Sequence, residues 1–170
     1  MTRYAALLRA VNVGGTGKLS MSELKAMCAD AGFKHVETYI ASGNVVFDAP
    51  HSAARVKAEL EARLLARARK PVGVAVRTAE ELRRILEANP FGAEPANHTV
   101  AIFLDEPPPA NCLSRVTGKL DEEMHAGARE IYVHYPHGIG RSKLKIPAAA
   151  NGTARNMNTI AKLADIAARR

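Results

Sequence analysis

The sequence predicts an α+β protein built from two related ferredoxin-like α/β subdomains with mixed, mostly antiparallel sheets. Two observations indicate this class: short apolar or β-branched runs alternate with helical patterns, and in the first half they follow the order βαββαβ of the ferredoxin-like fold. The stiff triplet Pro107-Pro108-Pro109 interrupts the second half. We predict a first subdomain over residues 1–90, including an additional helix, and a second over 91–170 whose C-terminal helix packs back on the first.

The elements of the first half follow from apolar spacing and capping signals. Residues 4–11 form a nearly continuous apolar run, typical of a buried strand. Ser20 and Glu23 have the spacing of a capping box, and Gly32 is a typical helix end. The segment Ala41-Ser42-Gly43 is the turn of a predicted hairpin. The predicted strands are 4–11, 35–40, 44–48 and 72–76, and the predicted helices begin at Ser20 and Ser52.

The second half mixes strands and helices in the predicted order βαββα. A helix that opens with the capping box of Thr78 and Glu81 precedes it and stops before Asn89-Pro90. We predict strands at 99–104, 120–125 and 130–135, a short helix at 111–116 and an amphipathic C-terminal helix over 153–165.

Composition and charge bound the classes of function. Hydrophobic residues make up 47% and charged residues 24% of the 170 residues, which argues against disorder. The two cysteines, Cys28 and Cys112, are interpreted as reduced thiols in structured segments. Because no apolar run approaches the roughly 20 residues of a membrane span, we predict a soluble, cytoplasmic protein with no membrane partner. The net charge of +7 favours anionic partners, although an arginine-rich genome explains it equally well.

Polar residues interrupt this pattern first at the end of the first predicted strand. Arg9 falls on the same face as Leu7 and Val11, and the glycine-rich loop that follows precedes a capped helix N-terminus, which favours an anion. The loop is not a P-loop, because that motif requires glycine at position 12 and serine or threonine at position 19. A purely structural tight loop is the alternative.

Two further segments complete the predicted site. In a βαββαβ unit the hairpin of the second and third strands lies at the same end of the sheet as the loop after the first strand, so the two should face each other. The predicted C-terminal helix begins with an arginine and two asparagines. Asparagine is a poor helix former. We predict that these segments bind a small phosphate- or carboxylate-bearing ligand. The predicted ligand-binding residues are Arg9, Asn12, Gly14, Gly15, Lys18, Ser42, Gly43, Asn44, Arg155, Asn156 and Asn158.

Five segments over nearly the full length resemble the bacterial domain-of-unknown-function family 1697: LLRAVNVGG, KLSMSELKAM, GFKHVETYIASGNVVF, ANPF and TARNMNTIAKLA. The resemblance implies an α/β protein of two related subdomains without an established activity. Met157 stands where most members are expected to carry tryptophan, which removes a ring able to stack on a ligand or a neighbouring residue. The family's recurrent polar positions fall on Arg9, Asn12, Gly14, Gly15, Tyr39, Ser42, Gly43, Asn44, Thr153, Arg155, Asn156, Asn158 and Thr159.

No catalytic residue, cofactor or metal site is identified by the sequence. Ser42 or Tyr39 could act as a nucleophile or in acid–base catalysis, but spacing places no general base beside either. His134 and His137 lack a clustered third ligand for zinc. The oligomeric state is not indicated.

Two other classes of function compete with the ligand site. The basic stretches 63–70 and 141–145 could bind nucleic-acid backbones weakly and without sequence specificity, since aromatic residues make up only 5% of the chain and tryptophan is absent. Alternatively, the polar residues could be structural and hold the subdomains together.

Overall fold

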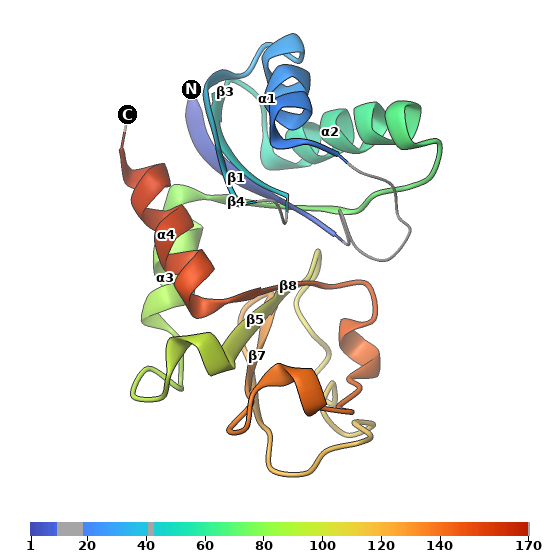
Figure 1. The fold of residues 1–170 in the computed structure, drawn as a ribbon, viewed down its shortest axis with the longest axis vertical. Coiled ribbons are helices and arrows are strands. Elements are labelled where there is room, and N and C mark those ends of the chain that lie inside the picture. Colours follow the sequence, from blue (N-terminus) through green and yellow to red (C-terminus); the bar gives the residue numbers. More distant parts are fainter. Residues whose placement is uncertain (10–18, 41–42, 170) are drawn as a thin grey trace. The chain divides into compact units, whose positions relative to one another are not determined.

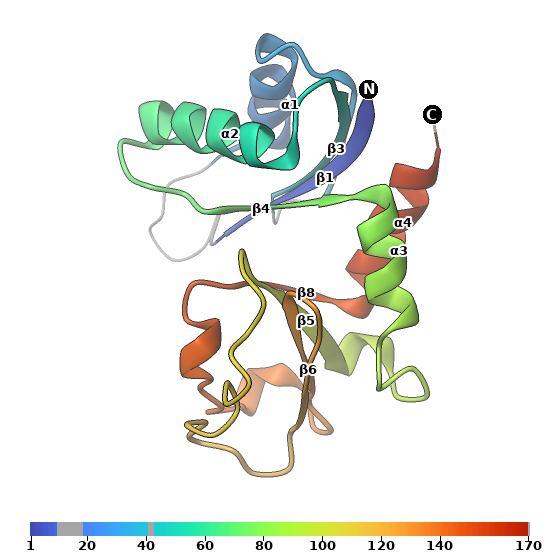
Figure 2. The ribbon, with the colours of Figure 1, turned by 180° about the vertical axis from the view of Figure 1, so that it is seen from behind.

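The chain is described from a computed structural model that defines residues 1–9, 19–40 and 43–169. It divides into two compact units, one of Met1–Arg84 with Lys162–Arg170 and one of Ile85–Ala161. Each unit contains a four-stranded sheet in which all neighbouring strands are antiparallel (Figures 1 and 2). The predicted α+β class with ferredoxin-like subdomains is therefore confirmed.

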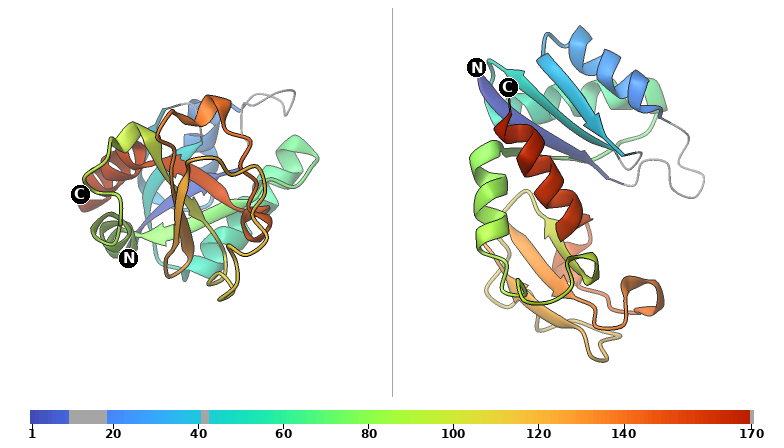
Figure 3. Two further views of the ribbon diagram at one scale, coloured as in Figure 1. Left: turned by 90° about the horizontal axis from the view of Figure 1, so that it is seen from below. Right: turned by 60° about the vertical axis from the view of Figure 1, so that its left-hand side comes forward.

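The first unit has the predicted βαββαβ order, and its strands are arranged β2-β3-β1-β4. Helices α1 and α2 cover one face of this sheet (Figure 3), where Leu8, Leu24, Phe47 and Leu60 are fully buried. The elements are β1 (Thr2–Leu8), α1 (Met21–Asp30), β2 (Lys34–Tyr39), β3 (Asn44–Ala49), α2 (Ala53–Ala68) and β4 (Val74–Thr78).

Local capping fixes the ends of α1, as the sequence predicts. The backbone N–H of Glu23 donates to Ser20 Oγ at 3.1 Å. At the other end, Gly32 adopts φ +88°, and the N–H groups of Phe33 and Gly32 donate to the carbonyls of Cys28 and Ala29 at 3.1 and 3.0 Å. This is the Schellman arrangement, in which glycine avoids the strain of the left-handed region.

The second unit contains β5 (Thr99–Phe103), β6 (Glu123–Ala126), β7 (Glu130–His134) and β8 (Thr153–Asn156), in the order β6-β7-β5-β8. The helix predicted at 111–116 is wrong: this segment forms turns. Cys112 N–H and Ser114 N–H bond carbonyls only three residues back, and so short a segment between the proline triplet and Gly118 gains too few helical bonds to offset nucleation. The order is therefore not the predicted βαββα.

Helices α3 (Ala79–Glu87) and α4 (Met157–Ala168) contain the two boundaries between the units. The capping box predicted at the start of α3 is confirmed, because Thr78 N–H donates to Glu81 Oε1 at 2.9 Å and Glu81 N–H to Thr78 Oγ1 at 3.1 Å.

The C-terminal helix starts later than predicted. Residues 153–156 pair with β5 as β8, and the helix begins only at Met157. Asn156 Oδ1 accepts a hydrogen bond from Thr159 N–H at 2.9 Å, which is the geometry of an N-cap. Arg155 therefore lies on a strand and Asn156 before the helix, so neither is an unfavourable residue within its first turn.

A buried carboxylate joins two loops of the second unit. Glu122 accepts hydrogen bonds from Leu120 N–H at 2.8 Å and Ser142 Oγ–H at 2.6 Å. The hydroxyl of Ser142 is the larger cause, and the backbone bond from Leu120 the next, of a pKa that falls to about 2 from the ordinary 4.5. Both bonds favour the charged form.

This lowered pKa predicts a specific acid sensitivity. The stabilisation by Glu122 is present above pH 4.5 and is lost as the pH falls from 4.5 towards 2. The reason is that the Glu122 carboxylate is protonated at a lower pH in the folded state than in the unfolded state. Urea unfolding of wild type and Glu122→Gln, followed by circular dichroism between pH 6 and 2, should show the larger stability loss in wild type. Parallel curves would contradict this assignment.

Candidate functional site

The carboxyl end of β1 lies between two glycine-containing segments. Leu8 N–H donates to the Gly43 carbonyl at 2.8 Å, and Arg9 N–H donates to the Gly73 carbonyl at 2.9 Å. Leu7 pairs with Asn44 across the β1–β3 ladder. The turn between β2 and β3 therefore lies at the end of the sheet where β1 ends, as the ferredoxin-like order predicts.

Arg9 is exposed in the turn that follows β1. A Cβ atom built on Gly73 would lie 3.8 Å from Arg9 Cβ and 3.9 Å from Arg9 Cδ, so the aliphatic part of the arginine lies against this glycine. The strand prediction extended through Arg9 to Val11, but β1 ends at Leu8. Because Arg9 is solvated rather than enclosed in a sheet face, its charge requires no buried counter-ion.

Asn44 holds the β2–β3 turn closed. Its side chain is fully buried, and its Nδ2 donates to the Tyr39 carbonyl at 3.0 Å. Gly43 has φ +85°, a conformation that favours glycine. Asn44 therefore supports the turn from inside. The other predicted residues of this end, Asn12, Gly14, Gly15, Lys18 and Ser42, lie outside the described residues.

The remaining predicted site residues belong to the second unit. Arg155 on β8 pairs with Ala101, and its Nη1 donates to the Ala154 carbonyl at 2.9 Å. Burial lowers the pKa of Arg155 to about 10 because desolvation disfavours the charged form. Asn158 is exposed in the first turn of α4. The gathering of these residues and Arg9 around one ligand stays a prediction.

Replacement of Arg155 by methionine is expected to stabilise the protein by about 1 kcal/mol, since the aliphatic packing is kept and a desolvated charge is removed. The pKa of Arg155 is lower in the folded state than its ordinary value of 12.5, so the charged side chain lowers the stability of the folded state. This loss of stability is complete below pH 10 and disappears only as the pH rises above 10. Urea unfolding at pH 7 measures the change. A loss of stability would instead show that Arg155 is a structural clamp.

A polar network in the second unit joins the exposed acid Glu94, the buried imidazole of His134 and the buried hydroxyl of Thr99. His134 Nδ1 lies 3.1 Å from Thr99 Oγ1, and His134 Nε2 lies 3.6 Å from Glu94 Oε2. The ring of Phe91 stacks on His134 with centroids 5.7 Å apart. Thr99 is fully buried, so no substrate reaches its hydroxyl and the network is structural. No sequence pattern indicates this network, because its members are separated by up to 40 positions.

The described residues contain no group of three histidine, cysteine or acidic side chains that could hold a metal ion. His137 instead lies 2.8 Å from Asp121. Cys28 and Cys112 are buried, as predicted, and burial raises the pKa of Cys28 to about 12. The Cys28 thiol is therefore unsuited to nucleophilic chemistry.

Two cations of the first basic stretch have carboxylate partners. Arg63 Nε lies 2.7 Å from Glu59 Oε1, and Arg67 forms an ion pair with Glu23. These acidic partners reduce the positive field that a nucleic-acid backbone would meet along α2. In the described part of the chain, no helix is both long and apolar enough to cross a membrane.

Together, the two antiparallel sheets and the βαββαβ order of the first unit define an α+β protein of ferredoxin-like subdomains. The chain belongs to the DUF1697 family, described as "Protein of unknown function (DUF1697)", whose model matches residues 1–132. The resemblance seen in the sequence is thereby confirmed, although the TARNMNT segment lies beyond the matched residues.

A similar solved structure is that of the conserved bacterial protein SP0830 from Streptococcus pneumoniae. The two chains are 26% identical, the match covers 98% of each, and the TM-score is 0.81. No curated protein matches the chain. The likeness to SP0830 therefore extends over both units' sequence, including the C-terminal segment.

Proposed function

We propose that this protein binds a small anionic ligand, bearing a phosphate or carboxylate group, at the carboxyl end of β1. The observation that supports this most directly is the position of Arg9, an exposed arginine whose backbone is fixed to Gly73 while its neighbour Leu8 is fixed to Gly43. An arginine guanidinium binds a carboxylate or phosphate through paired hydrogen bonds.

The surroundings of Arg9 suit such a ligand. The carbonyls of Gly43 and Gly73 hold the backbone of Leu8 and Arg9, and the Asn44 bond to Tyr39 holds the adjacent turn. The sequence that follows Arg9 adds Gly14, Gly15 and Lys18 before the N-terminus of α1, residue types that commonly supply N–H donors and a positive charge to an anion.

Arg9→Ala is expected to weaken anion binding about tenfold or more, since it removes a charge-assisted pair of hydrogen bonds. Thermal unfolding of wild type and variant with inorganic phosphate, citrate or ATP at constant ionic strength measures this as a lost rise in midpoint. Arg55→Ala is the control, because Arg55 is an exposed arginine in the first turn of α2. Equal midpoint rises in Arg9→Ala and wild type would reject the site.

The same series distinguishes the alternatives. Binding of a short single-stranded oligonucleotide that falls steeply with salt and persists in Arg9→Ala would indicate a nucleic-acid-binding surface instead. No midpoint rise with any anion, together with a lower midpoint for unliganded Arg9→Ala, would indicate a structural role for this residue.

A further inference from the structure

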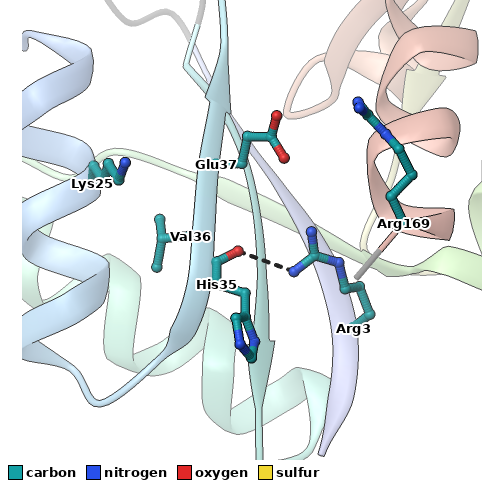
Figure 4. A pocket seen from close by; sticks show the side chains of 6 residues that line it. All are labelled: Arg3, Lys25, His35, Val36, Glu37 and Arg169. Atoms are coloured by element: carbon teal, nitrogen blue, oxygen red, sulfur yellow. Dashed lines mark hydrogen bonds between the residues drawn. The ribbon is translucent and has the colours of Figure 1, made fainter.

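A pocket of about 450 Å³ lies in the first unit, within the size range of small-molecule sites. Its lining comes from the start of β1, from α1, from the edge strand β2 and from the residue that follows α4 (Figure 4). The lining residues are Arg3, Lys25, His35, Val36, Glu37 and Arg169. None of them belongs to the predicted ligand site, and Arg3 and Arg9 are at opposite ends of β1.

Arg3 is the buried charge of this pocket, with 5% of its side chain exposed. Nη1 donates to the His35 carbonyl at 3.0 Å and Nη2 to the Ile166 carbonyl at 3.4 Å, which fixes the plane of the guanidinium. Nε is buried and has no hydrogen-bond partner among the described residues. In Figure 4 the guanidinium faces the space between Glu37 and Arg169.

A buried donor without an acceptor is uncommon in folded proteins and calls for a missing partner. Nη1 also lies 3.8 Å from Asp48 Oδ2, so this carboxylate balances much of the arginine's charge. An anionic ligand of this pocket would therefore be attracted chiefly by cations other than Arg3. It would also have to provide oxygen acceptors for the Arg3 guanidinium.

Lys25 and Arg169 provide those cations. Both side chains are exposed at the pocket, and neither forms an ion pair with another residue of the described chain. Glu37 is the carboxylate of the lining, and it likewise has no ion pair within the described chain. The pocket thus combines two unneutralised cations, a fixed guanidinium and one acceptor.

We infer that this pocket binds a phosphate monoester that carries hydroxyl groups. The phosphate, with a charge near −2 and three acceptor oxygens, interacts with Arg169 and the Arg3 guanidinium, and Lys25, which lies across β2 from them in Figure 4, attracts it at longer range. The Glu37 carboxylate accepts hydrogen bonds from the alcohol hydroxyl groups of the ligand. Its negative charge repels an anion that has no alcohol hydroxyl group to donate to it. This site is separate from the one proposed around Arg9.

Isothermal titration of the full chain with glycerol 3-phosphate and with inorganic phosphate, at constant ionic strength, tests the inference. Lys25→Ala and Arg169→Ala should each weaken glycerol 3-phosphate binding about threefold, and the double variant about tenfold, as expected for exposed charges. Glu37→Gln should tighten inorganic phosphate about threefold. Arg55→Ala, which replaces an exposed arginine on α2, should leave these values unchanged.

Three results would overturn the inference. The first is no saturable heat with either compound, and the second is equal affinity in wild type and the Lys25→Ala/Arg169→Ala double variant. The third is binding that Arg9→Ala abolishes, which would assign the ligand to the other end of β1. Circular dichroism of the variants, all altered at exposed positions, checks that the fold is retained.

Discussion

Gly118→Ala is expected to destabilise the second unit by about 3–5 kcal/mol, a large part of the stability of an ordinary domain. An alanine Cβ at this position would lie 2.0 Å from the Lys143 carbonyl oxygen and 2.7 Å from its carbon. The obstacle is backbone that cannot rotate away, since the adjacent Thr117 and Lys145 exchange hydrogen bonds of 3.0 and 2.8 Å. The substitution must therefore separate the two loops that Glu122 also joins.

Gly138→Ala is the matched control for this prediction. Gly138 also lies in the second unit and in the left-handed region, at φ +85° against +71° for Gly118, but a Cβ there meets nothing within 4 Å. Its ψ of 159° places it in a region that is essentially restricted to glycine, so the alanine should cost only the conformational strain of about 1–3 kcal/mol. Urea unfolding followed by circular dichroism gives both values, and similar losses in the two variants would show that the contact with Lys143 is unimportant.

Phe47→Ala is expected to destabilise the first unit by about 3–5 kcal/mol. Phe47 is fully buried on β3 and stacks on Phe33 with ring centroids 4.4 Å apart and planes 10° from parallel. Tyr4 approaches it from β1 at 6.3 Å. Truncation would leave a cavity between the sheet and the helices that cover it, lined by rings that cannot collapse into it.

Phe47→Leu separates the lost volume from the lost ring contact. It keeps most of the buried apolar surface and should cost about 1–1.5 kcal/mol, including the stacking with Phe33. The measurement is again urea unfolding, with the amide exchange of the β1 and β3 backbone reporting on the first unit alone. A cost of Phe47→Ala below that of the leucine variant would mean that this core repacks freely.

The two proposed ligand positions use β1 differently. At its carboxyl end, Arg9 is exposed and its backbone is held by glycine-containing segments. At its amino end, Arg3 is buried and its guanidinium is held by carbonyls of β2 and α4. The first arrangement leaves the Arg9 side chain accessible to a ligand, whereas the second holds the guanidinium of Arg3 in one orientation.

Local chemistry made the first unit predictable from sequence. Capping signals at Ser20, Ser52 and Thr78 correspond to observed hydrogen bonds that need only neighbouring residues. The hairpin turn was also located correctly, because Gly43 and Asn44 satisfy a backbone requirement within the turn itself. The candidate site at the end of β1 followed from this topology.

Long-range pairing decided what the sequence misassigned. Residues 153–156 directly precede the apolar spacing of the C-terminal helix and are predicted as its start, yet they form β8 because β5, about 50 residues earlier, offers them an edge to pair with. The segment 111–116 shows the opposite case, in which a weak helical pattern receives too little tertiary support to nucleate a helix.

The sequence by itself determined the family, the α+β class and the βαββαβ unit, because capping, turn chemistry and apolar periodicity act over a few residues. Only the tertiary structure brought together Arg3, Lys25, Glu37 and Arg169, which come from four elements and share no pattern in the sequence. It also decided that residues 153–156 pair with β5 as a strand. A side chain's partners depend on which segments the fold places beside it, and that information is distributed over the whole chain.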